Sequence, residues 1–140
     1  MQVIKVDKDL RNDWDEFVTS HAIDGGFLQS WGWGDFQKAL GRQVFRLAVL
    51  DEESNLVGAI LLVKIEIHFE YNYLYSARGP VVSSKNSKVV EALLKEVKKL
   101  AKEEKSFLVR MDPAWRLVMK KVYLVIIIEK VKRRYSQNVA

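Results

Sequence analysis

The chain has 140 residues, of which 49% are hydrophobic and 29% charged, and this length and composition suit one globular domain with its own core. It contains no cysteine and two histidines, which excludes a disulfide framework and a zinc–thiolate site and argues against any metal site. The net charge of +5 lies at the end: the last 25 residues hold 7 of the 23 Lys and Arg but 1 of the 18 Asp and Glu. The first 115 residues, with 16 basic and 17 acidic side chains, are balanced, so no DNA partner is expected.

The first 40 residues predict a short strand followed by two helices. Polar and apolar residues alternate over residues 2–6, which is typical of a strand. Asp7 is expected to cap a helix over about residues 8–20, because its carboxylate can accept the free amides of the first turn. After a glycine turn, Ser30 is expected to cap a second helix, which Gly41 ends.

The next segment predicts a hairpin, a further strand, the clearest helix of the chain and another strand. The hairpin joins residues 44–50 to residues 56–67 through a polar turn, and a strand over residues 73–77 ends at Gly79-Pro80. An apolar stripe at helical spacing marks a helix over about residues 85–104. A strand over residues 107–111 ends at Asp112-Pro113. This order of elements predicts an α/β (α+β) fold, a mixed sheet flanked by helices.

The last part of the chain differs in character from the rest. We expect one domain over residues 1–115 and a divergent basic tail over residues 116–140. The apolar run over residues 122–128 is either one more strand or foreign sequence after a frameshift or a truncation. It is far shorter than the roughly 20 residues that a membrane span needs, and residues 1–7 do not read as a signal peptide, so the expected location is the cytoplasm.

Three segments place polar or flexible residues at the ends of apolar elements. They are residues 26–38 (GFLQSWGWGDFQK), residues 75–81 (YSARGPV) and residues 107–113 (FLVRMDP). Ligands commonly bind at such ends in α/β sheets, so these segments are the candidates for a binding site.

At these segments the sequence resembles the Fem-type peptidoglycan bridge aminoacyltransferases, and the resemblance covers roughly residues 10–115. It implies an acetyltransferase-like (GNAT-like) first domain whose cleft holds a nucleotide- or lipid-linked precursor, with peripheral proximity to the membrane. A second such domain, reached by aminoacyl-tRNA, is implied elsewhere. The implied reaction is aminoacyl transfer from that tRNA to the stem peptide of the precursor, without metal or cofactor. On its own, the chain is expected to turn over poorly.

The resemblance also implies site residues in the first segment. Trp31 and Trp33 either line the precursor cleft or pack in the core, as aromatic residues at helical spacing usually do. Gln37 stands where the family carries a basic residue that is associated with the diphosphate of the precursor. Its neighbour Lys38 replaces that residue if the helix is rotated, and is otherwise a solvated surface lysine.

The other two segments supply Tyr75, Arg78 and Asp112. Tyr75 and Arg78 are candidate substrate-binding residues, and a guanidinium suits a phosphate because it donates two parallel hydrogen bonds. Asp112 matches an acidic residue that the family carries before proline. Its carboxylate is the catalytic candidate, either holding the peptide of the precursor or accepting a proton from the attacking amine.

Two other functions stay open from the sequence. One is an N-acyltransferase that uses acyl-coenzyme A, although Pro80 removes an amide donor from the turn where a pyrophosphate would bind. The other is an inactive truncated fragment or a small binding module, which the unmatched tail favours.

Overall fold

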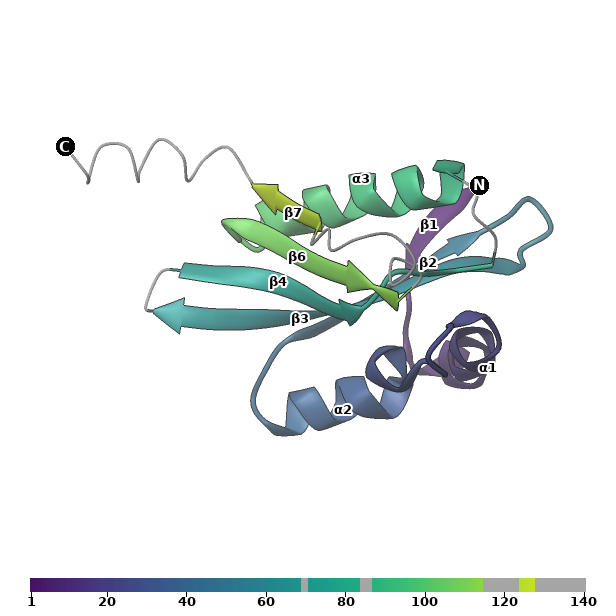
Figure 1. Ribbon diagram of the computed structural model, residues 1–140, viewed down its shortest axis with the longest axis horizontal. Helices are drawn as coiled ribbons and strands as arrows, with labels where there is room; N and C mark the ends of the chain where they lie inside the picture. The colour runs from purple at the N-terminus through teal and green to yellow at the C-terminus, as the bar shows by residue number, and fades with distance from the viewer. Residues whose placement is uncertain (69–70, 84–86, 115–123, 128–140) are drawn as a thin grey trace.

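Strand pairing joins the chain into a mixed sheet with helices on both faces, as the computed structural model shows for residues 1–68, 71–83, 87–114 and 124–127 (Figure 1). The strands in the described residues are β1 (Gln2–Lys5), β2 (Val44–Leu50), β3 (Leu56–His68), β4 (Tyr71–Arg78), β5 (Val81–Val82), β6 (Leu108–Pro113) and β7 (Leu124–Ile127). The helices are α1 (Arg11–His21), α2 (Trp31–Ala39) and α3 (Ser87–Glu103), with 3-10 turns η1 (Lys8–Leu10) and η2 (Phe27–Gln29).

The sheet has the strand order β1-β2-β3-β4-β6-β7, with β5 beside β3. Neighbouring strands are antiparallel except β4 and β6, which are parallel because α3 carries the chain back between them. The predicted mixed sheet flanked by helices is therefore confirmed. The residues that the structure describes contain no helix that is long and apolar enough to cross a membrane.

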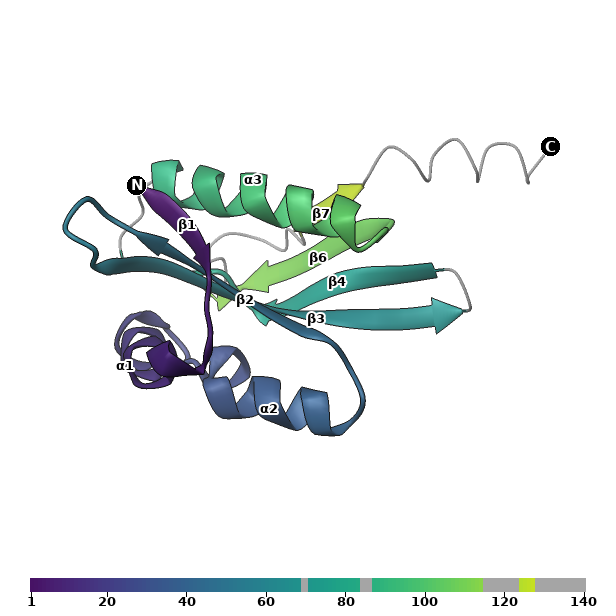
Figure 2. The ribbon, with the colours of Figure 1, turned by 180° about the vertical axis from the view of Figure 1, so that it is seen from behind.

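Two hydrophobic clusters, one on each face, hold the helices to the sheet. Strand side chains alternate between the faces, so neighbouring residues of β2 and β3 enter different clusters. Helix α3 covers one face and packs its apolar stripe on Leu47, Ile60, Leu62, Leu74, Val109 and Met111. Helices α1 and α2 cover the other, where Trp14, Phe17, Val18 and Trp31 pack on Ala48, Ala59, Leu61 and Val81. Figure 2 shows these two layers from behind.

The helix caps agree with the sequence at one site and differ at another. Ser30 caps α2 as expected, since its Oγ accepts a hydrogen bond from the Trp33 amide at 3.1 Å. Asp7 was expected to cap the helix over about residues 8–20, and that expectation is wrong. Its carboxylate accepts from the Asp9 amide and caps the short turn η1, while α1 begins one turn later after Leu10. The helix α2 ends at Ala39, shortly before Gly41.

On one side of β3, the pairing is broken between the part that β4 covers and the part that β5 covers. Strand β4 stays on β3 as far as the pair Val63–Tyr75, and β5 joins β3 again at the pair Ala59–Val81. Residues 60–62 of β3 therefore face the longer segment 76–80, which contains the cis peptide bond between Gly79 and Pro80. Strand β5 was not predicted from the sequence, because two valines are too short a run to mark a strand.

The apolar run over residues 122–128 contains strand β7, which pairs with β6 from Leu124–Met111 to Ile127–Leu108. Of the two readings of this run, the structure therefore shows a strand for residues 124–127. Residues 115–123 and 128–140, which make up the rest of the tail, lie outside the described residues. The division of the chain at residue 115 stays a prediction.

Candidate functional site

The site is built on the parallel ends of β4 and β6. These strands remain paired to their last residues, with Ala77 beside Asp112 and Arg78 beside Pro113. Along β6, Val109 and Met111 pack under α3, so the intervening Arg110 and Asp112 lie on the face that α1 and α2 cover in part. The same alternation along β4 places Tyr75 on that face, next to Leu74 on the other.

Asp112 holds the cluster together through both of its carboxylate oxygens. Its Oδ1 accepts a hydrogen bond from the Arg78 amide at 2.8 Å, and its Oδ2 accepts one from the Tyr75 hydroxyl at 3.3 Å. The Arg110 guanidinium lies 5.3 Å from the centre of the Tyr75 ring. Burial raises the pKa of the Tyr75 phenol above its ordinary value, and the negative charge of Asp112 raises that pKa further.

Arg78 carries the backbone out of β4 in a left-handed conformation, with φ of 59°. Residues other than glycine adopt this conformation uncommonly, and the carboxylate of Asp112 is the partner that fixes the Arg78 amide in it. The positive charges of Arg110 and Arg78 oppose this rise in the pKa of the Tyr75 phenol. Two arginines, a phenol and a carboxylate thus share one end of the sheet. Such a set can bind an anionic group and a peptide together.

The tryptophans of the first segment have different surroundings. Trp31 is 5% exposed and packs edge to face on Trp14 at 6.3 Å in the core, so its ring is part of the hydrophobic cluster under α1 and α2. Trp33 is half-buried, with its ring between Phe27 at 5.6 Å and Phe36 at 5.4 Å. Trp33 is thus the more accessible of the two, although contact with a substrate stays a prediction for both.

The side chains of Gln37 and Lys38 differ in exposure to solvent. Gln37 is buried, and its Oε1 accepts a hydrogen bond from Arg42 Nη1 at 2.7 Å, which brings a guanidinium next to it. Lys38 is exposed on the last turn of α2. The structure thus brings Tyr75, Arg78 and Asp112 together, whereas none of the contacts described for the four α2 candidates reaches that cluster. Their role in substrate binding stays a prediction.

Gln29, the last residue of η2, connects α1 to the end of β4 and was not singled out from the sequence. Its main-chain carbonyl accepts a hydrogen bond from the Trp14 indole at 2.8 Å. Its side-chain amide reaches the end of β4, where it donates to the Ala77 carbonyl at 2.6 Å and to Ser76 Oγ at 3.1 Å. Nothing in a single sequence marks this glutamine, because the partners of its side chain lie more than 30 residues away.

Arg46 is a second residue that the sequence does not reveal. Its guanidinium is buried against the Trp31 ring at 3.7 Å and donates to the Trp31 carbonyl and to Asp35. Burial lowers the pKa of Arg46, although Asp35 opposes that shift. Gly34 leaves room for this guanidinium, since a Cβ there would overlap Nη2 of Arg46. This cation joins α2 to β2, and it is a structural support for the α2 candidates.

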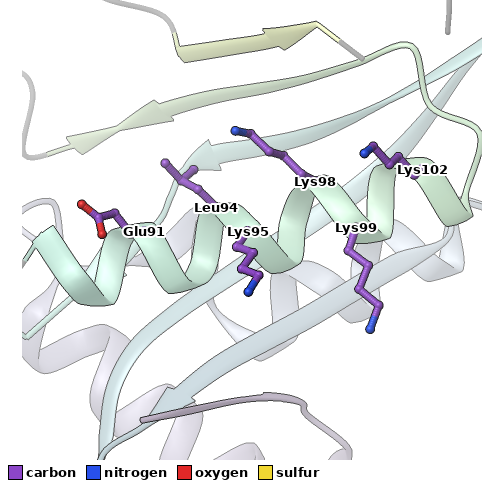
Figure 3. A pocket seen from close by; sticks show the side chains of 6 residues that line it. All are labelled: Glu91, Leu94, Lys95, Lys98, Lys99 and Lys102. Atoms are coloured by element: carbon purple, nitrogen blue, oxygen red, sulfur yellow. The ribbon is translucent and has the colours of Figure 1, made fainter. Parts of the chain in front are cut away.

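A surface groove of about 460 Å³ runs along the outside of α3, on the face of the sheet opposite to Asp112 (Figure 3). Its lining residues are Glu91, Leu94, Lys95, Lys98, Lys99 and Lys102. Figure 3 shows Lys95 and Lys99 pointing away from Lys98 and Lys102, so the lysines do not converge on one point. Among the described residues, no group of His, Cys, Asp or Glu side chains is arranged to hold a metal ion.

Curated proteins are similar to this chain in sequence. A lipid II:glycine glycyltransferase of Staphylococcus epidermidis is 39% identical over 100 residues, which cover 71% of this chain and 24% of the relative. The Staphylococcus aureus protein of that name is 36% identical over 71% of this chain and 23% of its own length. The chain thus spans about a quarter of these relatives.

The solved structures extend the likeness to the fold. The crystal structure of FemX matches with a TM-score of 0.70 and 30% identity, over 81% of this chain and 27% of that one. A probable acetyltransferase matches with a TM-score of 0.64 over 100% of this chain and 89% of its own, but at 14% identity it shows the fold alone. The model of the FemAB family matches residues 10–138, and the chain therefore belongs to the FemAB family.

Proposed function

We propose that this chain is the precursor-binding part of an aminoacyltransferase that builds the interpeptide bridge of peptidoglycan. The observation that carries the proposal is the cluster of Tyr75, Arg78 and Asp112 at the paired ends of β4 and β6, in a chain of the FemAB family. The relatives are named as glycyltransferases that act on lipid II, which supports transfer of an amino acid to a peptidoglycan precursor.

The proposed reaction joins two substrates that the protein aligns. An amino group of the stem peptide attacks the ester carbonyl of aminoacyl-tRNA, an amide bond forms, and the ester C–O bond breaks to release the tRNA hydroxyl. The ester is already activated, so alignment and charge stabilisation provide most of the catalysis. A second domain delivers the tRNA, and the reaction takes place in the cytoplasm, near the membrane surface when the acceptor is lipid-linked.

Asp112 is proposed to position the acceptor amine. Both of its oxygens already accept a hydrogen bond, from the Arg78 amide and the Tyr75 hydroxyl, but a carboxylate has about four acceptor sites. The remaining sites can accept from the amine of the stem peptide, and this arrangement favours holding the amine over removing its proton. Arg78, with Tyr75 beside it, is proposed to bind the diphosphate of the precursor.

The α2 residues complete the proposal. Trp33, Gln37 and Lys38 are proposed to contact the precursor from α2, with Arg42 held at Gln37 as an additional cation. Trp31 is proposed to support that side from the core, since its ring packs on Trp14 and Arg46.

Calorimetric titration with a UDP-linked pentapeptide precursor tests the proposal. Saturable binding is expected, and Arg78→Ala and Asp112→Asn are each expected to weaken it by about tenfold or more, because charge-assisted hydrogen bonds contribute roughly 1.5–3 kcal/mol. Lys99→Ala, an exposed substitution on the opposite face, is the control and should bind like the wild type. Absence of saturable binding, or wild-type affinity in both site variants, would contradict the assignment.

A thermal shift with acetyl-coenzyme A but not with the precursor would favour the acyl-coenzyme A alternative.

A further inference from the structure

The peptide group between Ala77 and Arg78 is held from both of its sides. Its carbonyl oxygen accepts a hydrogen bond from Nε2 of Gln29 at 2.6 Å. Its N–H, which belongs to Arg78, donates to Oδ1 of Asp112 at 2.8 Å. Gln29 and Asp112 are therefore connected through one rigid planar unit.

The side chain of Gln29 occupies the break where β4 has left β3. Ordinary strand pairing would give the Leu61 amide a carbonyl partner on the neighbouring strand, but residues 76–80 do not pair with β3 there. The Oε1 of Gln29 accepts from the Leu61 amide at 2.8 Å, while its Nε2 donates to the Ala77 carbonyl on the other side. The side-chain amide thus pairs one main-chain group on each side of the break. Leaving either of these groups unpaired in the interior would cost free energy.

Gln29 is itself fixed in this position. It is 0% exposed, and its main-chain carbonyl is bound by the Trp14 indole. Gly79 leaves room for it, because a Cβ at residue 79 would overlap Ser76 Oγ and approach both polar atoms of the Gln29 amide to 2.7 Å. A residue this well fixed can determine the position of the groups that it contacts.

We infer that Gln29 is a positioning residue for the precursor site, acting through the Ala77–Arg78 peptide group on the Arg78 backbone and the Asp112 carboxylate. This inference rests on the proposed function. A hydrogen bond to the carbonyl of a peptide group polarises that group and strengthens the bond that its N–H donates. Gln29 therefore holds the turn in the left-handed conformation of Arg78 and strengthens the contact that fixes Asp112.

Two substitutions remove the hydrogen bonds of Gln29 in different ways. Gln29→Glu keeps the acceptor but replaces the NH₂ donor by an oxygen. Gln29→Met keeps the length of the side chain, has no donor and introduces no charge. The matched control is Asn72→Asp, which changes a buried side-chain amide on β4, at the end opposite to Ala77 and Arg78. There the Nδ2 of Asn72 donates to the Glu104 carbonyl at 3.1 Å, and Ser106 donates to its Oδ1.

Two measurements follow, each at a temperature well below the unfolding midpoint of the variant concerned. In the ¹H–¹⁵N spectrum, the Gln29 variants are expected to shift the Arg78 and Leu61 amides and speed the hydrogen exchange of Arg78. Asn72→Asp should leave both amides in place. In calorimetric titration with the UDP-linked pentapeptide, the Gln29 variants should bind about tenfold more weakly, and Asn72→Asp should bind within about twofold of the wild type.

The outcomes separate the inference from the proposed function. If the wild type does not bind the precursor, the proposed function fails, while the amide shifts still report on Gln29. If the folded Gln29 variants keep the wild-type Arg78 amide and affinity, the inference is overturned. It is also overturned if Asn72→Asp weakens binding as much as the Gln29 variants do, because the effect would then follow stability alone. Should Gln29→Glu fail to fold because of its buried charge, Gln29→Met gives the same readouts without that charge.

Discussion

Tyr75 differs from a solvated tyrosine because ionising it would place a second negative charge 3.3 Å from the Asp112 carboxylate. Burial first, and then Asp112, raise its pKa above the ordinary value of about 10. The unfolded chain therefore releases this proton at lower pH than the folded chain, so stability falls as the pH rises above about 10. In a titration followed by phenolate absorbance, the wild type should show a late-ionising tyrosine that Tyr75→Phe removes. Asp112→Asn should move this component to lower pH, because it removes the negative charge beside the phenol, and an unchanged component would contradict the assignment.

Two glycines of α2 provide a matched test of the buried Arg46. A Cβ at Gly34 would overlap the Arg46 guanidinium, whereas a Cβ at Gly32 would meet nothing within 4 Å. In urea denaturation, Gly34→Ala is expected to lower the free energy of unfolding by about 1–3 kcal/mol, because it displaces a buried charge. Gly32→Ala should raise it by about 0.5–1 kcal/mol, since alanine favours the helix. Equal effects of the two substitutions would show that Arg46 moves aside freely.

The sequence reveals some of these residues and conceals others for a physical reason. Arg78 and Asp112 stand beside turn-forming prolines at strand ends, which a local pattern can show. Gln29 and Arg46 act through partners that are distant in the chain, such as Leu61, 32 positions from Gln29. Only the folded register of β3 and β4 creates the gap that Gln29 fills, so its importance follows from tertiary structure.

Among the elements, α3 is the one whose packing the sequence predicts best. Its apolar positions follow one stripe, and Leu93 on that stripe is fully buried between α3 and the sheet. Leu93→Ala should lower the free energy of unfolding by about 2–5 kcal/mol, the range for truncating a buried leucine. Lys95→Ala, two residues along on the exposed side, should change it by less than about 0.5 kcal/mol. Urea midpoints of the two variants measure this difference, and similar values would contradict the burial of the stripe.

Shorter elements escape sequence patterns because their stability comes from partners. Strand β5 consists of two residues that pair with Gly58 and Ala59, and η2 is a single turn whose last residue is bound to Trp14 and Leu61. Neither has enough length for a period to show. The long strands β2 and β3 are apolar runs joined by a polar turn, and α3 has an apolar stripe at helical spacing. All three were predicted within a few residues of their observed ends.

At the scale of the whole molecule, the two faces of the sheet differ in the side chains that they carry. Each face carries a hydrophobic cluster, and the face that α1 and α2 cover in part also carries the polar cluster beside Asp112. The probable acetyltransferase shares the fold at 14% identity, so this architecture does not by itself define the chemistry. The proposed function therefore depends on the Asp112 cluster and the Gln29 bridge, and not on the fold alone.

The sheet also depends on β7, which covers the edge of β6. Strand β7 pairs with Leu108 to Met111, and on β6 the side chains of Val109 and Met111 belong to the core under α3. A chain that ends at residue 120 would leave the outer hydrogen-bonding edge of β6 open, and an open edge beside apolar side chains favours pairing with another molecule. We expect that chain to associate and to unfold at lower urea concentration than the full chain. A chain that ends at residue 130 keeps β7, and we expect it to have the same association state and urea midpoint as the full chain. Light scattering after size-exclusion chromatography measures the association, and equal masses for the two shortened chains would show that β7 does not protect the β6 edge.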